Sequence, residues 1–174
     1  MRARKFWGWG YEDELLTAEE ENNIDKRIAK TFELDSVERI EIPKIENVNL
    51  PDSSLKCPNS LKAIVSNDKL ERLNHSYGKS FPDSARSILG QFPAPPDFVA
   101  FPNSEEDITN ILDWASSNDI AVIPYGGGSS VCGGVETNVG DDYNGVISLD
   151  MKNLSSIIEI DRDCLLYTYP SPRD

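Results

Sequence analysis

The chain has 174 residues, of which 39% are apolar and 9% aromatic, and its 30 acidic and 17 basic side chains give a formal net charge of −13. That length suits one domain with a modest core, and so negative a surface repels nucleic-acid phosphates, which excludes a nucleic-acid partner. No apolar run approaches the roughly 18 residues of a transmembrane helix.

The negative charge is concentrated in the second part of the chain. Residues 1–100 hold 17 acids and 14 bases, whereas residues 101–174 hold 13 acids and 3 bases. Basic side chains are therefore nearly absent from the second part. We expect any phosphate ligand there to be held at short range by backbone N–H groups.

The cysteines and the chain start favour an intracellular protein. Cys57, Cys132 and Cys164 are odd in number and lack the spacing of a disulfide framework or a metal site, so we predict no metal. The basic start at residues 1–5 is followed by no apolar segment, so export is not expected.

Residues 1–92 form the less regular part of the sequence. An acidic run precedes a predicted helix over 24–32, and prolines then interrupt a polar stretch that indicates an extended arm. Two short helices are predicted over 61–73 and 83–89. The proline-rich stretch 92–96 cannot be helical, and we place the main domain boundary there.

From residue 97 onward the pattern is that of alternating strands and helices. Ser104, followed by three acids, is typical of a helix start. An apolar stripe at helical spacing then follows: Ile108, Ile111, Leu112 and Ala115. Short apolar runs on either side predict a βαβ crossover with parallel strands, and two more strands follow. The predicted strands are 98–101, 120–123, 146–149 and 157–160.

A glycine-rich loop directly follows the second predicted strand, with five glycines in the nine residues 126–134. Ligands of open α/β sheets bind at the carboxyl ends of parallel strands, and N–H groups without neighbouring Cβ atoms can form an anion-binding nest. The competing interpretation is a flexible turn without a ligand. No Gly-Lys-Ser/Thr of a P-loop is present, and no helix-forming run follows Gly128 as a G-x-G-x-x-G fingerprint requires.

Four stretches of the sequence carry a family resemblance. The segment "IAVIPYGGGSS" with "GVISLDMKNLSSIIEID" resembles the start of the FAD-binding domain of the vanillyl-alcohol-oxidase-type flavoproteins. The segments "FWGWGYED" and "HSYGKSFPDSARSILGQFPAPPDFVAFP" resemble, within that group, the alkylglycerone-phosphate synthase (alkyldihydroxyacetonephosphate synthase) family. The resemblance covers residues 5–13 and about 70–163.

This resemblance implies an α+β fold in which residues 1–92 are an N-terminal arm and 93–163 are the first part of the FAD-binding domain. It places the pyrophosphate of FAD on one loop, with the glycines offering backbone N–H groups and the serines capping the phosphates. The cofactor-binding residues implied are Pro124, Tyr125, Gly126, Gly127, Gly128, Ser129 and Ser130.

The resemblance also implies a reaction. Enzymes of this family replace the acyl chain of acylglycerone phosphate with a fatty alcohol in ether-lipid synthesis, without net redox change. Two alternatives stay open: an FAD-linked oxidase or dehydrogenase of a 2-hydroxy acid such as D-lactate, and a non-catalytic interaction module. Animal relatives are peroxisomal, which implies an intracellular enzyme of the peroxisome, with the cytoplasm as the alternative. Association with a membrane surface and a homodimer are further expectations for the parent enzyme.

No catalytic residue of the family falls within this chain, so we expect a truncated fragment that is inactive by itself. His75, the only histidine, is expected to be structural. Residues 164–174 match no part of the family and resemble read-through of sequencing adapter, so we expect this tail to be non-native.

Overall fold

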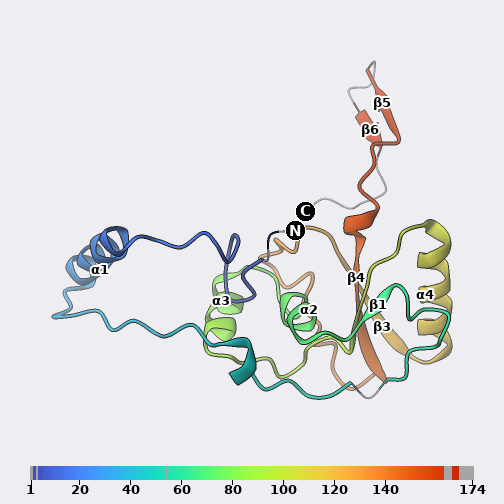
Figure 1. Ribbon diagram of the computed structural model, residues 1–174, viewed down its shortest axis with the longest axis horizontal. Helices are drawn as coiled ribbons and strands as arrows, with labels where there is room; N and C mark the ends of the chain where they lie inside the picture. Colours follow the sequence, from blue (N-terminus) through green and yellow to red (C-terminus); the bar gives the residue numbers. More distant parts are fainter. Residues whose placement is uncertain (1, 3, 54, 163–165, 169–174) are drawn as a thin grey trace.

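The computed structural model describes residues 2, 4–53, 55–162 and 166–168. Its body is a four-stranded sheet packed against α4, while α1 stands away from the body at the end of an extended arm (Figure 1). The elements in chain order are α1 (Ala18–Phe32), η1 (Ile45–Asn47), β1 (Val65–Ser66), α2 (Lys69–Asn74), α3 (Phe81–Ile88), β2 (Phe98–Ala100), α4 (Glu105–Ser117), β3 (Ile120–Tyr125), β4 (Gly145–Asp150), η2 (Met151–Asn153), β5 (Glu159–Asp161) and β6 (Leu166–Thr168).

The strand order in the sheet is β1-β2-β4-β3. Strands β2 and β3 both run parallel to β4, which confirms the predicted parallel crossover through α4. The two strands of the crossover are not neighbours, because β4 inserts between them. The register pairs Tyr125 with Asp150, so the carboxyl ends of β3 and β4 lie side by side.

Helix α4 begins where the sequence predicts, because the Ser104 hydroxyl accepts the backbone N–H of Asp107 at 3.1 Å. Ile111 and Ala115 are fully buried against the sheet. Leu112 departs from the predicted stripe and is 46% exposed. The ring of Trp114 packs on this core instead, with its centroid 6.4 Å from that of Phe98 on β2.

The predicted helix over 61–73 is only partly correct. Residues 61–64 form turns, and Val65 and Ser66 form β1, which pairs antiparallel with Ala100 and Val99 of β2. The helix starts only after Asp68, whose carboxylate caps the first turn of α2. Edge pairing with β2 thus wins over local helical propensity. It also joins segments on both sides of the boundary predicted at 92–96 into one sheet.

A second apolar cluster fixes the start of the chain on the body. Phe6 is 5% exposed and its ring lies 6.2 Å from that of Phe92, which stacks on Tyr77 at 5.3 Å. Leu73 of α2 and Val48 complete the buried set. The aromatic N-terminal segment is therefore a packed part of the fold, anchored by Phe6, whereas Trp9 is 59% exposed.

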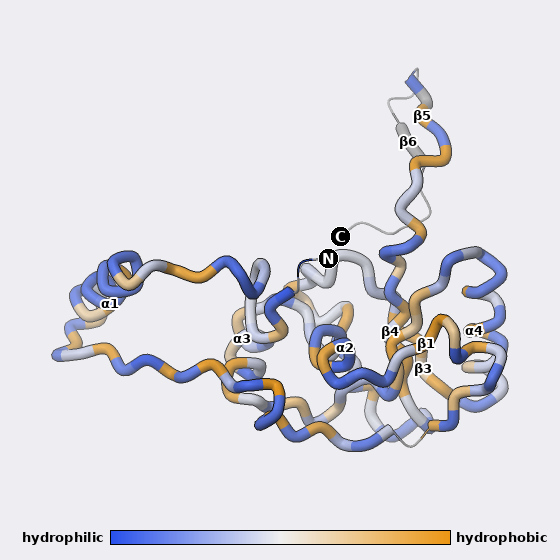
Figure 2. The backbone as a smooth tube through the Cα atoms, viewed as in Figure 1, coloured by the Kyte–Doolittle hydropathy of each residue, from blue (hydrophilic) through white to orange (hydrophobic). Residues whose placement is uncertain are grey.

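Helix α1 differs from the others in having no buried residue. It includes the helix predicted over 24–32 and begins earlier, because Thr17 and Glu20 form a capping box. In Figure 2 α1 is mostly hydrophilic, whereas the strands of the sheet are rich in apolar residues. α1 is thus held by its own hydrogen bonds and by the ion pairs of Arg39 with Glu21 and Asp25.

The predicted strand over 157–160 is found as β5, which pairs antiparallel with β6 in a hairpin that projects from the body (Figure 1). Of the tail predicted to be non-native, residues 164, 165 and 169–174 lie outside the described residues. The origin of this tail remains a prediction.

Candidate functional site

The glycine loop lies where the parallel strands end. Residues 124–130 complete β3 and continue beyond it, beside Asp150 at the end of β4. A cavity of about 570 Å³ opens at this edge. Its lining comes from the strand ends, from α2 and from the N-terminal segment, and includes Arg2, Arg4, Asn74, His75, Tyr125, Gly126, Asp150 and Lys152. The structure thus brings the loop to a cavity at the edge predicted from the sequence.

The buried ring of Tyr125 packs against the glycine loop at Gly128. Tyr125 is 4% exposed, its hydroxyl donates to the carbonyl oxygen of Asn74 at 2.9 Å, and its ring centroid lies 4.2 Å from that of His75. Gly128 passes directly over this ring at a φ of +71°. A β-carbon on Gly128 would lie closer than 3.0 Å to the Tyr125 hydroxyl. The fold itself therefore requires glycine at 128, with or without a ligand.

Gly126 and Gly127 need a different explanation. Neither has a positive φ, so the left-handed conformation that favours glycine does not account for them. Gly127 is exposed, and within the described part of the chain the N–H groups of Gly127 and Gly128 have no hydrogen-bond acceptor. Unpaired N–H groups on a loop without side chains are what an anionic ligand requires.

The two serines differ in what their groups already contact. The carbonyl oxygen of Ser130 accepts the backbone N–H of Lys79 at 2.7 Å, and its hydroxyl accepts that of Gly134 at 3.0 Å. Ser130 thus fixes the path of the loop through its own acceptors. Ser129 is half-buried and lines a smaller cavity of about 160 Å³ between the loop and the N-terminal segment.

The basic side chains near this loop were not predicted, because the sequence led us to expect only backbone N–H groups and serine hydroxyls there. Arg4 donates to the carbonyl oxygen of Gly127 at 2.7 Å, and Lys79 lies in the same small cavity. Arg2 and Lys152 line the larger cavity. The signal in the sequence is the basic start of the chain, but nothing local connects it to a loop more than 120 residues later.

His75 is buried at the C-terminal end of α2, as expected of a structural histidine. Its Nδ1 lies 2.7 Å from the carbonyl oxygen of Glu71, and its Nε2 lies 3.1 Å from a carboxylate oxygen of Asp150. Because a carbonyl oxygen can only accept a hydrogen bond, Nδ1 carries a hydrogen. The hydrogen of the second bond lies either on Nε2 of His75 or on the carboxyl group of Asp150. The carboxylate partner, 75 positions away, was not predicted.

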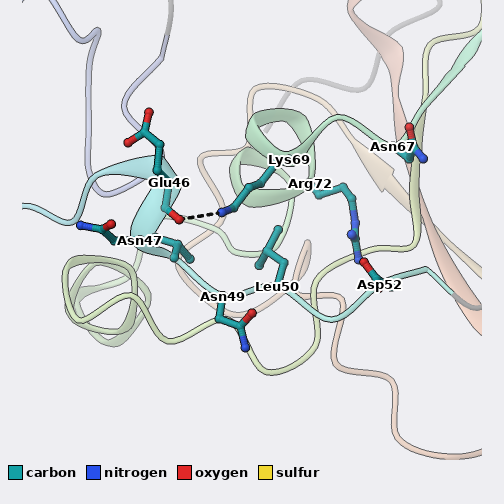
Figure 3. A pocket seen from close by; sticks show the side chains of 9 residues that line it. Glu46, Asn47, Asn49, Leu50, Asp52, Asn67, Lys69 and Arg72 are labelled. Atoms are coloured by element: carbon teal, nitrogen blue, oxygen red, sulfur yellow. Dashed lines mark hydrogen bonds between the residues drawn. The ribbon is translucent and has the colours of Figure 1, made fainter.

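A third cavity, of about 440 Å³, is lined by residues of η1 and α2, among them Glu46, Lys69 and Arg72, and by none of the glycine loop (Figure 3). At its wall, the largely buried Arg72 donates to the carbonyl oxygens of Pro96 at 2.7 Å and Pro51 at 2.8 Å. Burial lowers the pKa of Arg72. The guanidinium here holds two loops together, and this cavity has no part in the predicted site.

No helix among the described residues is long and apolar enough to cross a membrane. They also contain no group of three or more His, Cys, Asp or Glu side chains arranged to hold a metal ion.

Comparison with known proteins identifies the second half of the chain. Residues 96–167 match the family described as FAD binding domain. FAD is the cofactor of this domain. The predicted α+β fold class, as the start of such an FAD-binding domain, is confirmed.

Relatives and solved structures extend the likeness beyond the FAD-binding domain. The chain is 35% identical over 121 residues to alkyldihydroxyacetonephosphate synthase of Trypanosoma brucei brucei, an alignment that covers 66% of the chain and 20% of that protein. A structure of alkyldihydroxyacetonephosphate synthase superposes with a TM-score of 0.74 at 25% identity, over 92% of the chain and 34% of the other. The family resemblance seen in the sequence is thereby confirmed.

The chain is also 31% identical over 148 residues to the cytochrome-linked mitochondrial D-lactate dehydrogenase 1 of Saccharomyces cerevisiae, covering 74% of the chain and 25% of that enzyme. The chain therefore spans about one fifth to one quarter of the length of these curated relatives.

Proposed function

We propose that the chain is the diphosphate-binding part of an FAD enzyme of the alkyldihydroxyacetonephosphate synthase type. The observation that supports this most directly is the pair Gly126 and Gly127, at which no positive φ calls for glycine. They stand at the carboxyl edge of the parallel strands, with Arg4 beside them, and the N–H groups of Gly127 and Gly128 have no acceptor among the described residues. Such an arrangement fits the diphosphate of FAD.

The parent enzyme, in this proposal, exchanges the acyl chain of acylglycerone phosphate for a fatty alcohol. When bound, FAD supplies the reactive flavin ring. The residues described above hold its phosphates: Gly126 to Gly128 through backbone N–H groups, and Ser129 and Ser130 at the end of the loop, on the support of Pro124 and Tyr125. We infer that the chain alone is inactive. We also infer that residues 1–92 are an N-terminal arm, that residues 93–163 are the first part of the FAD-binding domain, and that residues 164–174 are a non-native tail.

We further propose an intracellular location for the parent enzyme, in the peroxisome by family resemblance, with a homodimer and contact with a membrane surface. The yeast relative keeps oxidation of a 2-hydroxy acid such as D-lactate as a second candidate reaction on the same cofactor loop.

Titration of the purified chain with FAD tests the cofactor assignment. Gly127→Val places a branched side chain where the phosphates approach, at a position whose φ tolerates it, so FAD binding should be lost while the unfolding midpoint stays unchanged. Unchanged affinity in Gly127→Val would overturn the loop assignment and favour the non-catalytic module.

The reaction itself is tested in the source cells, by introducing the Gly127→Val codon at the genomic locus. We expect alkyl ether lipids to fall and growth on D-lactate to continue. Loss of D-lactate oxidation with normal ether lipids would establish the second candidate instead.

A further inference from the structure

The aromatic-glycine segment brings a cation onto the glycine loop. Residues 4–11 form a tight hairpin, closed by the bridge between Arg4 and Tyr11 and by the N–H of Lys5 donating to Gly10 at 3.1 Å. Gly10 permits the turn with a φ of +80°. Phe6 anchors the hairpin in the second apolar cluster. The side chain of Arg4 is thereby directed to the carbonyl oxygen of Gly127.

A second cation faces Arg4 across the small cavity. The ammonium group of Lys79 lies 3.3 Å from the carbonyl oxygen of Lys5 in the same hairpin. The cavity of about 160 Å³ is lined by both cations, Arg4 and Lys79, and by Gly127 and Ser129 of the loop. Burial and the positive charge of Arg4 lower the pKa of Lys79 to about 8, although Asp83 opposes this shift.

Neither cation is neutralised by an ion pair in the described part of the chain. Arg2 pairs with Asp13 and Glu14, and Arg86 and Arg39 also have carboxylate partners. Arg4 and Lys79 have none, although acids outnumber bases almost two to one in this sequence. Two like charges are thus held near each other, and Asp83, which acts on Lys79, makes no ion pair with either of them in that part of the chain. Beside backbone N–H groups that have no acceptor among the described residues, they create a local positive potential that attracts an anion.

We propose that Arg4 and Lys79 form, with the backbone at Gly127, a phosphate-binding site whose ligand is the diphosphate of FAD. This inference rests on the proposed function and adds the side-chain charge that the glycine loop lacks. It also gives the aromatic-glycine segment a role: the hairpin presents Arg4 to the cofactor. The phosphate of a small ester such as dihydroxyacetone phosphate shares the same chemistry and is the competing source.

The test compares Arg4→Gln with Arg39→Gln, which removes the same charge from the distant arm. Each variant of the full chain is titrated with FAD, ADP, riboflavin and dihydroxyacetone phosphate by calorimetry. A charge-assisted contact to phosphate predicts about 10-fold weaker binding of FAD and ADP by Arg4→Gln. Riboflavin, which has no phosphate, should be unaffected, Arg39→Gln should behave as wild type, and Arg4→Lys should recover part of the loss.

A second measurement does not depend on affinity differences between variants. At pH 8 the amine of Lys79 is partly deprotonated, so an acylating reagent should label it, and mass spectrometry can quantify the label. Saturating ADP should slow the labelling of Lys79 several-fold and leave that of Lys26 on α1 unchanged.

The outcomes separate this inference from the proposed function. If Gly127→Val abolishes FAD binding while Arg4→Gln does not weaken it, the inference is wrong and the proposed function stands. If ADP binds in an Arg4-dependent way and FAD does not bind, the phosphate site stands and the FAD assignment fails. Preference for dihydroxyacetone phosphate over ADP, or no protection of Lys79 by ADP, overturns the diphosphate assignment.

Discussion

Gly78 lies so close to the glycine loop that a β-carbon on it would come nearer than 3.0 Å to the carbonyl oxygen of Ser130. The next residue, Lys79, donates its backbone N–H to that same oxygen at 2.7 Å. This contact ties the segment after α2 to the end of the glycine loop, and it is possible only without a side chain at position 78.

Gly78→Ala should therefore destabilise the chain by about 2–4 kcal/mol, as expected when a buried backbone contact must separate. It should also weaken FAD binding, because the loop loses its support. Chemical denaturation followed by Trp fluorescence measures the first effect. Gly8→Ala is the matched control, because nothing lies within 4 Å of its added carbon; equal stabilities of the two variants would contradict the contact.

The glycines of the loop should separate into two classes. Gly128→Ala meets both a positive φ and the Tyr125 hydroxyl, so we expect a loss of about 1–3 kcal/mol. Gly127→Ala should leave the free energy of unfolding within about 0.5 kcal/mol. Thermal melts of the two single variants without FAD decide the point. A larger loss for Gly127→Ala would show that the fold, and not a ligand, requires that glycine.

His75 and Asp150 should be energetically coupled. Removing either partner leaves a buried polar group without its hydrogen bond, so His75→Ala and Asp150→Ala should each cost about 2–4 kcal/mol. In a double-mutant cycle measured by urea denaturation, we expect a coupling free energy of about 1–3 kcal/mol. Additive losses would mean that the pair contributes nothing beyond the packing of each side chain.

Lys79 should make stability depend on pH in the alkaline range. Its pKa falls from 10.5 to about 8 on folding, so the unfolded chain binds the proton more tightly and stability from this group rises between pH 8 and 10.5. Lys79→Met should therefore be more stable than wild type at pH 7 by up to about 3 kcal/mol, an advantage that shrinks toward pH 10.5. Denaturation curves at pH 7, 9 and 10.5 check this. A difference that stays constant with pH would contradict it.

Helix α1 should unfold independently of the body. Because it buries no residue, Ala29→Pro should reduce the helical circular dichroism signal and leave the main unfolding transition within about 0.5 kcal/mol. Ala115→Pro in α4, at a position that is 1% exposed, is the comparison and should abolish cooperative unfolding. A large shift of the transition in Ala29→Pro would show that the arm supports the body.

Local patterns determined β2, α4, β3, β4 and the loop between them. Apolar runs, the Ser104 cap and the glycine cluster act within a few residues of where they stand, so the sequence alone could predict them. The same patterns identify an apolar face without naming its partner. For that reason Leu112 was expected in the core, whereas Trp114 is the residue that packs there. Strand β1 was predicted as part of a helix, because a two-residue edge strand forms only through its pairing with β2.

Only the tertiary structure decided the chemistry around the loop. Arg4 and Gly127 are 123 positions apart, and His75 and Asp150 are 75 positions apart. No periodicity links such residues, because their approach depends on how the whole chain folds. It depends on the register of β3 and β4, on the glycine at 78, and on the packing of Phe6 in the second apolar cluster. The sequence alone located a glycine loop with no charge of its own, and long-range packing brought Arg4 and Lys79 to it.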